Sequence, residues 1–180
     1  MIRLLTAPLN FLSQLQRLDP LLPLFARATF AATLLVYFRS SALAKIGPNP
    51  WTPSSGAFAQ IFPRALEAVS YDASRLSPIH HFIFLSGTYA EFILPALLVL
   101  GLLTRLMALG MMGFITLQSL TDLFGHGGIA HAETLGRWFD RFPDGAILDQ
   151  RAFWMLTLSI LLVKGAGPVS LDAWWLNRRQ

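Results

Sequence analysis

Four long apolar stretches constrain the fold of this chain more than any other feature of its sequence. They cover approximately residues 21–43, 79–103, 106–124 and 152–167. A helix needs about 20 apolar residues to cross a bilayer, and some spans manage with ~17. The fourth stretch is the shortest, so it must borrow flanking residues or let the long side chain of Lys164 reach the membrane surface. The pattern predicts an all-α integral membrane protein that folds as a four-helix bundle in the lipid bilayer.

The amino-acid composition excludes several other classes of protein. Of the 180 residues, 54% are hydrophobic and only 13% are charged, whereas soluble domains carry about 25% charged residues. The chain has no cysteine, which excludes disulfide scaffolds and thiolate metal sites. Its net charge of +4 is scattered near the ends of the apolar stretches, and without a basic block we expect no nucleic-acid partner. The length predicts one membrane domain over residues 1–180.

The segments outside the spans predict short helices on the membrane surface. Residues 2–18 place leucines at helical spacing with polar residues between them, as in an interfacial amphipathic helix; a frayed hydrophobic tail is the alternative. The segment AFAQIFPRALEAVS predicts a short surface helix interrupted at Pro63. Near the C-terminus, Ser170 can cap a further helix with Asp172 in its first turn.

The positions of basic residues predict the orientation in the membrane. Four spans place both termini on one side, together with the short turn around Thr104 and Arg105. Lysines and arginines lie near the span ends on that side with almost no acids, and such residues favour the cytoplasm. We therefore expect both termini in the cytoplasm. On the opposite side, Trp138 and Phe139 of the second long loop are available as interfacial anchors.

An acidic residue, Glu91, lies near the middle of the second span. A charged group at the bilayer centre costs at least a few kcal/mol, so such groups usually face the protein interior and find a partner. Arg27 is the natural candidate, since it lies about 9 Å of helical rise inside the first span. Glu91 lies about 18 Å from the cytoplasmic end of the second span, a gap that an extended arginine side chain largely covers. We expect the two residues to pair.

Other polar residues fall close to Glu91 along the spans. Pro95 has no N–H and so removes the helical partner of the Glu91 carbonyl. Thr88 lies one turn before Glu91, and Gln118 or Thr116 of the third span can complete the polar site. Three interpretations of Glu91 stay open: an Arg–Glu clasp that fixes helix register, a proton relay or contact for a quinone headgroup, and a protonated carboxyl bonded to a neighbouring backbone group.

Histidines and acids gather at the opposite ends of the second and third spans. In the four-span topology these residues share the outer interface: His80, His81, Asp122, His126 and His131. Imidazole and carboxylate ligands suit zinc, copper, nickel or iron, but the spacing matches no compact metal motif. A metal site, a proton acceptor facing a quinol and ordinary interfacial histidines are the three interpretations.

The stretch AEFILPALLVLGLLTRLMAL, together with GAGPVSLDAWW near the C-terminus, resembles the DoxX family of small bacterial membrane proteins. The first span, RATFAATLLVYFRSSALAK, is similar to the first helix of that family, and the resemblance extends from Arg27 to Trp175. It implies a four-helix bundle in the bacterial cytoplasmic membrane, in which Glu91, Arg27 and Arg105 correspond to family residues. Relatives often carry a histidine where this chain has Arg151, and the outer loop is longer here.

The resemblance implies a function linked to redox chemistry. Better-understood relatives are membrane subunits of respiratory or sulfur oxidation systems, such as a thiosulfate:quinone oxidoreductase, and others accompany oxidative-stress or metal-handling systems. We expect an accessory subunit that contacts quinone and works with a protein partner or as a homo-oligomer. The alternatives are metal or small-molecule handling by the outer histidines, and a scaffold that recruits a partner without chemistry of its own.

Overall fold

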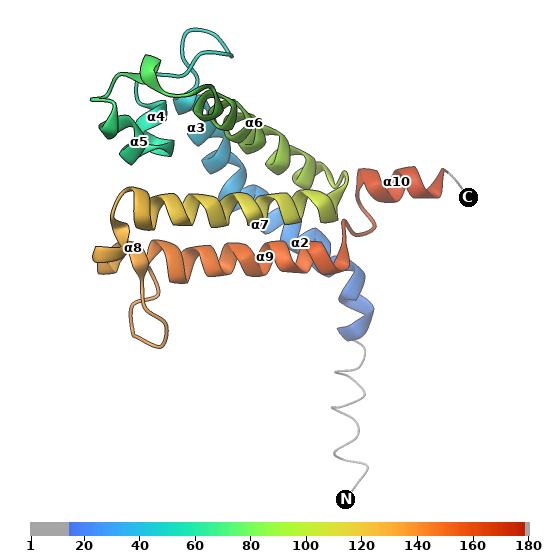
Figure 1. Cartoon of the computed structure of the whole chain (residues 1–180). Coiled ribbons are helices and arrows are strands. Elements are labelled where there is room, and N and C mark those ends of the chain that lie inside the picture. The colour runs from blue at the N-terminus through green and yellow to red at the C-terminus, as the bar shows by residue number, and fades with distance from the viewer. Residues whose placement is uncertain (1–14, 179–180) are drawn as a thin grey trace, which may run out of the picture.

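The computed structural model describes residues 15–178, and every regular element within this range is a helix (Figure 1). Four helical segments are long and apolar enough to cross a membrane: Leu18–Lys45, Pro78–Leu100, Thr104–Gly125 and Ala146–Lys164. The four predicted spans are therefore confirmed as helices of sufficient length and hydropathy. The fourth is longer than expected because a π-helical segment, η6 (Ala146–Gln150), leads directly into α9 (Arg151–Lys164).

The first candidate span is built from four consecutive pieces. A 3-10 helix, η1 (Leu15–Leu21), leads into α2 (Leu22–Phe30), a π-helical turn η2 (Ala31–Leu35) and α3 (Val36–Lys45). Buried side chains recur in steps of four through this region: Phe30, Leu34, Phe38 and Ala42. Steps of four exceed the 3.6 residues of an α-helical turn, and the wider π turn keeps these side chains on one face.

The second and third spans, α6 (Pro78–Leu100) and α7 (Thr104–Leu120), are joined by a very tight turn. Gly101 ends α6 in the left-handed region with φ 70°, where glycine is favoured because it has no Cβ. A Cβ on Gly101 would also lie 2.6 Å from the Cβ of Ser170. Leu103 adopts a left-handed conformation as well, and α7 then continues through the π-helical η4 (Thr121–Gly125).

Successive spans run in opposite directions, so the molecule has two distinct ends (Figure 1). The turn end holds the α6–α7 turn and α10 (Leu171–Asn177). The loop end holds the short helices α4 (Ala57–Ile61), α5 (Pro63–Ala68) and α8 (Ala132–Leu135). The helix α9 packs against α7 and α2, whereas α3 packs against α6. Figure 1 shows α6 and α7 close together at the turn end and diverging toward the loop end. One core lies between the spans and includes Leu98, Met111 and Leu158.

A second, smaller core lies at the loop end. The helices α4 (Ala57–Ile61) and α5 (Pro63–Ala68) meet at Phe62, so the predicted break at Pro63 is confirmed. Phe58 and Leu66 of these helices pack with Phe84 of α6. Beyond them, η3 (Ala73–Arg75) is capped by Asp72, and hydrogen bonds from the Ser74 hydroxyl and backbone N–H lower the pKa of that carboxyl. The second loop carries η5 (Gly128–Ala130) and α8 (Ala132–Leu135).

The C-terminal helix α10 begins where the sequence predicts it. The hydroxyl of Ser170 accepts a hydrogen bond from the backbone N–H of Ala173 at 3.1 Å, which confirms the predicted cap.

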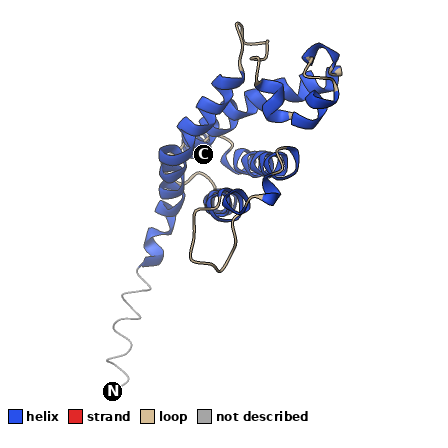
Figure 2. Ribbon diagram, turned by 90° about the vertical axis from the view of Figure 1, so that its left-hand side faces the viewer, coloured by secondary structure: helices blue, strands red, loops and turns tan. Residues whose placement is uncertain are grey.

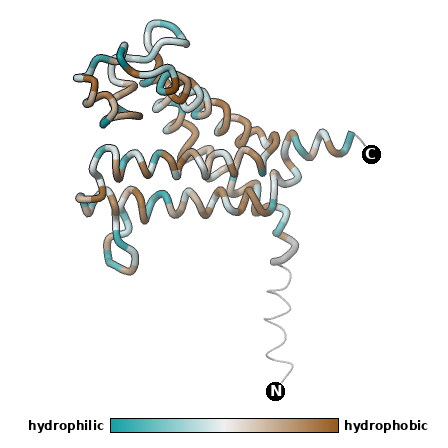
Figure 3. The backbone as a smooth tube through the Cα atoms, in the orientation of Figure 1, coloured by the Kyte–Doolittle hydropathy of each residue, from teal (hydrophilic) through white to brown (hydrophobic). Residues whose placement is uncertain are grey.

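Viewed along a perpendicular direction, α7 and α9 are seen end-on beside the first span (Figure 2). Apolar residues dominate the spans and polar residues the connecting loops (Figure 3). The predicted N-terminal amphipathic helix over 2–18 lies mostly outside the described residues.

Candidate functional site

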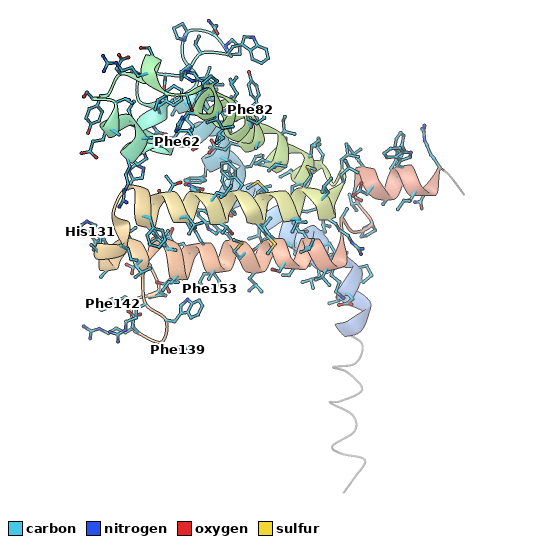
Figure 4. All side chains as sticks on the ribbon, viewed as in Figure 1. Phe62, Phe82, His131, Phe139, Phe142 and Phe153 are labelled. Atoms are coloured by element: carbon cyan, nitrogen blue, oxygen red, sulfur yellow. The ribbon has the colours of Figure 1, made fainter. Side chains whose placement is uncertain are left out.

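A cavity of 1210 Å³ opens where α6 and α7 diverge. We call it the lateral cavity: its walls come from α3, α6 and α7 with η4, and α4 and α5 cover it at the loop end. Much of its rim is apolar and exposed, with Phe82 of α6 64% exposed and Leu117 of α7 65% exposed. Five aromatic side chains line it: Tyr37, Phe62, Phe82, Phe114 and Phe124. Figure 4 shows Phe82 on α6 and Phe62 beside α4 and α5.

A buried ion pair forms part of the cavity wall. The Nζ atom of Lys45 lies 2.8 Å from both Oε1 and Oε2 of Glu91. Glu91 is only 4% exposed and the Lys45 side chain 9%. Lys45 also donates to the Ser41 hydroxyl at 2.7 Å and lies 3.3 Å from the Ser41 carbonyl. Its side chain therefore points back along α3 toward the N-terminus of that helix, as helical side chains do.

The predicted pairing of Arg27 with Glu91 is wrong. The guanidinium of Arg27 donates instead to three backbone carbonyls at the turn end. Its Nε atom lies 3.2 Å from the Val99 carbonyl oxygen, and its Nη1 atom lies 3.0 Å from that of Ala166 and 2.6 Å from that of Val169. Arg27 thus connects the end of α6 to the loop between α9 and α10.

The register of the helices explains this difference. The first span begins at Leu18, so Arg27 lies close to the turn end and level with Val99. Glu91 lies about two helical turns before Val99, roughly 12 Å along the helix axis. The turn end also offers carbonyl groups that no helix satisfies, and the planar guanidinium with its five N–H donors suits several of them at once. Lys45 reaches Glu91 from the other direction.

Two further predicted residues, Thr88 and Gln118, line the same cavity. Thr88 is 1% exposed, and its hydroxyl oxygen has no hydrogen-bond partner. The side-chain amide of Gln118 donates to the Tyr37 hydroxyl at 2.8 Å, while its Oε1 atom is inaccessible and has no partner. These two lining residues thus each carry a polar atom without a partner, but both atoms are enclosed by protein and do not face the open cavity. Thr116, the alternative to Gln118, bonds the Met112 carbonyl of its own helix instead.

At the loop end, Asp122 and His126 also line the cavity. Asp122 accepts a hydrogen bond from Arg151, and the Nη1 atom of Arg151 lies 2.8 Å from the Ser119 hydroxyl. This second ion pair joins α9 to the end of α7. The Nε2 atom of His126 lies 3.0 Å from the Gln60 carbonyl oxygen, which links η4 to α4. Both residues are thus tied to neighbouring elements.

The remaining outer histidines lie apart from the cavity lining. His80 stacks edge-on against Phe62, and its Nδ1 atom lies 2.8 Å from the Ser77 hydroxyl, while His81 packs against Phe58. His131 lies near Glu133 at the α8 end of the molecule (Figure 4). Within residues 15–178, no three histidine or carboxylate side chains are grouped closely enough to hold a metal ion.

From the sequence alone, Lys45 had no assigned partner, and Tyr37 and Ser41 had no assigned role. A signal for them exists, because Tyr37, Ser41 and Lys45 recur every four residues near the end of the first span. That spacing places them on one face, which is the face that lines the cavity. Arg151 carried no comparable signal, because the residues three and four positions after it, Trp154 and Met155, are apolar.

The arrangement combines a large apolar space with a short polar wall. Such a site suits a molecule with an apolar body and a small polar head. No family model, curated protein or solved structure matches this chain.

Proposed function

We propose that this chain is an integral membrane subunit that binds a quinone-type lipid in the lateral cavity. The observation that carries the proposal is the buried Lys45–Glu91 pair on the wall of a cavity with an apolar, aromatic lining. A quinone has a flat ring with polar oxygens and an apolar tail. The ring suits the aromatic wall, and the tail suits the exposed apolar rim formed by residues such as Phe82 and Leu117.

In this proposal the chain forms a four-helix bundle and lies in the bacterial cytoplasmic membrane. The opening of the lateral cavity between α6 and α7 then faces lipid, so a ligand dissolved in the bilayer enters the cavity from the side. The short helices α4, α5 and α10 lie at the interfaces, and exposed Trp174 of α10 suits the headgroup region. The DoxX-like segments support this placement and a role as accessory subunit of a redox system with a protein partner or a second copy.

Filling the cavity tests the proposal. Gly87 of α6 lines it, and a Cβ at this position would meet only the Phe114 ring, at 4.0 Å. We expect Gly87→Leu to occupy the ligand space and to reduce quinone retained through purification in mild detergent by about tenfold or more, equivalent to ~1.4 kcal/mol of affinity. The measurement is quinone extracted per mole of protein, quantified by chromatography.

Gly113 of α7 supplies the matched control. A Cβ at Gly113 would meet nothing within 4 Å, and this residue is not part of the cavity lining. Gly113→Leu should therefore retain quinone as the unmodified protein does. The proposal fails if the unmodified protein retains no quinone from quinone-containing membranes, or if both variants lose it equally. Recovery of a protein partner without any quinone would favour the scaffold.

A further inference from the structure

A second cavity, with a volume of 740 Å³, lies at the turn end, where α7 begins, α9 ends and α10 follows (Figure 1). We call it the turn groove. It shares no lining residue with the lateral cavity. Two basic residues line it: Arg105, the second residue of α7, and Lys164, the last residue of α9. Both side chains are exposed, so the groove is a separate, positively charged site at the end of the spans.

The side chain of Arg105 is held across the end of α9. Its Nη2 atom donates to the Val163 carbonyl oxygen at 3.2 Å, and such carbonyls at a helix C-terminus lack a partner within the helix. Its Nε atom lies 3.5 Å from the position that a Cβ on Gly165 would occupy, so the guanidinium passes close to the backbone there. A guanidinium has five N–H groups, and the bond to Val163 uses one. Arg105 is therefore positioned by the fold and keeps N–H groups for a ligand.

The charge of Arg105 has no acidic counterpart. Among residues 15–178, no carboxylate forms an ion pair with Arg105. Asp172 also lines the groove, but its carboxylate already accepts hydrogen bonds from two backbone N–H groups and one hydroxyl at the start of α7. Lys164 pairs with Asp19, and because both side chains are exposed, solvent screens this pair and makes it weak. The groove thus favours an anion beside Arg105.

Apolar side chains continue from the groove along the spans. Leu106 of α7 lines the groove and is 58% exposed. Leu109, three residues further along the helix, lies on the same face and is 55% exposed. Trp175 and Leu176 of α10 complete the lining, and tryptophan is enriched at the headgroup level of membranes. A ligand in the groove therefore meets positive charge at its polar end and an apolar strip beside it.

We propose that the turn groove binds the phosphodiester group of an anionic phospholipid, whose acyl chains lie along Leu106 and Leu109. Arg105 donates hydrogen bonds to the phosphate oxygens, and Lys164 adds a second positive charge. Basic pockets between spans on the cytoplasmic side suit anionic headgroups, and the turn end is the end that we expect in the cytoplasm. A zwitterionic lipid suits the groove less, because it brings its own cation toward Arg105. This site requires the membrane placement proposed above but is independent of a quinone in the lateral cavity.

Lipid competition in detergent tests this site. The purified, delipidated protein is equilibrated with equal amounts of dioleoylphosphatidylglycerol and dioleoylphosphatidylcholine, which share acyl chains and differ in net charge. Native mass spectrometry then counts the lipids that remain bound. We expect phosphatidylglycerol to be enriched about tenfold in the first bound lipid, as one charge-assisted hydrogen bond implies. Arg105→Gln should abolish the enrichment, whereas Arg105→Lys, which keeps the positive charge, should retain most of it.

Arg178→Gln supplies the matched control. Arg178 is exposed at the end of α10 and lies over the Trp174 ring, outside the groove lining. This variant removes the same charge from the same end of the molecule, and it should keep the enrichment.

Four outcomes would overturn the lipid site. They are equal binding of the two lipids by the unmodified protein, persistence of the enrichment in Arg105→Gln, its loss in Arg105→Lys, and an equal loss in Arg105→Gln and Arg178→Gln. Displacement of phosphatidylglycerol by an excess of inorganic phosphate would overturn it as well, because the groove would then recognise free phosphate. Each of these outcomes leaves the proposed quinone binding intact, since Gly87→Leu tests that binding separately.

Discussion

At the scale of single residues, the pairing of Lys45 with Glu91 is the most consequential contact in the chain. A carboxylate within an apolar span requires a cation and hydrogen bonds. The Lys45 ammonium supplies both to Glu91, and the Ser41 hydroxyl accepts a further hydrogen bond from that ammonium. In this pair, the charge of each side chain is compensated by the charge of the other. Removing one leaves an uncompensated buried charge, whereas replacing both by apolar side chains leaves none.

The stability of single and double variants follows from this dependence. We expect Lys45→Met to lower the free energy of unfolding by roughly 3–5 kcal/mol, and the double variant Lys45→Met with Glu91→Met to come within about 1 kcal/mol of the unmodified protein. Titration with a denaturing detergent in mixed micelles measures both. The exposed Arg75 and Asp72 pair provides the comparison, since Arg75→Met should cost about 1 kcal/mol or less. A double variant as unstable as the single one would contradict the expectation.

At the scale of elements, the turn end is held by contacts between segments far apart in sequence. The carboxylate of Asp172 in α10 accepts hydrogen bonds from the backbone N–H groups of Leu103 at 2.8 Å and Thr104 at 3.0 Å. It thereby caps the N-terminus of α7, where a negative charge is favourable. The backbone N–H of Asp172 donates in turn to the Gly101 carbonyl at 2.9 Å. The α6–α7 turn and the start of α10 therefore form one interlocked structure.

Loss of the Asp172 carboxylate should destabilise the turn end of the molecule. We expect Asp172→Ala to lower the free energy of unfolding by about 1–2 kcal/mol, the usual cost of losing a helix cap, and to increase proteolysis near residue 103. The same detergent titration, with limited proteolysis, measures both effects. Asp144→Ala, in the exposed loop before α9, should stay within about 0.5 kcal/mol. Equal effects of the two substitutions would show that the cap contributes nothing.

At the scale of the whole molecule, the first and last described residues both lie near the turn end, and this arrangement constrains the topology in a membrane. The four candidate spans alternate in direction. The start of the first span and α10 therefore lie at the same end of the molecule, the turn end. The loop end then lies on the other side. The loop between α8 and α9 projects there, with Phe139 and Phe142 at its tip (Figure 4).

The absence of native cysteine makes this topology directly measurable. We expect single cysteines at exposed Ser55 and Asp140, both in loops of the loop end, to react with a membrane-impermeant maleimide on intact cells. A cysteine at exposed Asn177 of α10 should react only after lysis. Labelling with a permeant maleimide corrects for differences in reactivity. Reaction at position 177 on intact cells would contradict the expectation that both termini lie in the cytoplasm.

The local features of this protein could be predicted from residues that are close together in the chain. Hydropathy and length located the four helices, Pro63 separated α4 from α5, and Ser170 capped α10. Each of these depends on a few neighbouring residues, because propensity, capping and apolar length act along the chain. Glu91 was identified as a buried acid for the same reason, since an acid in an apolar span must face inward.

The contacts between side chains of different helices could not be predicted in this way. The π turn in the first span, the register of its helices against α6 and the divergence of α6 from α7 place Lys45, not Arg27, beside Glu91. These same relations create the lateral cavity and bring Asp172 to α7. Helix register and crossing angle arise from packing between faces that are far apart in sequence. The periodicity along one helix does not encode them.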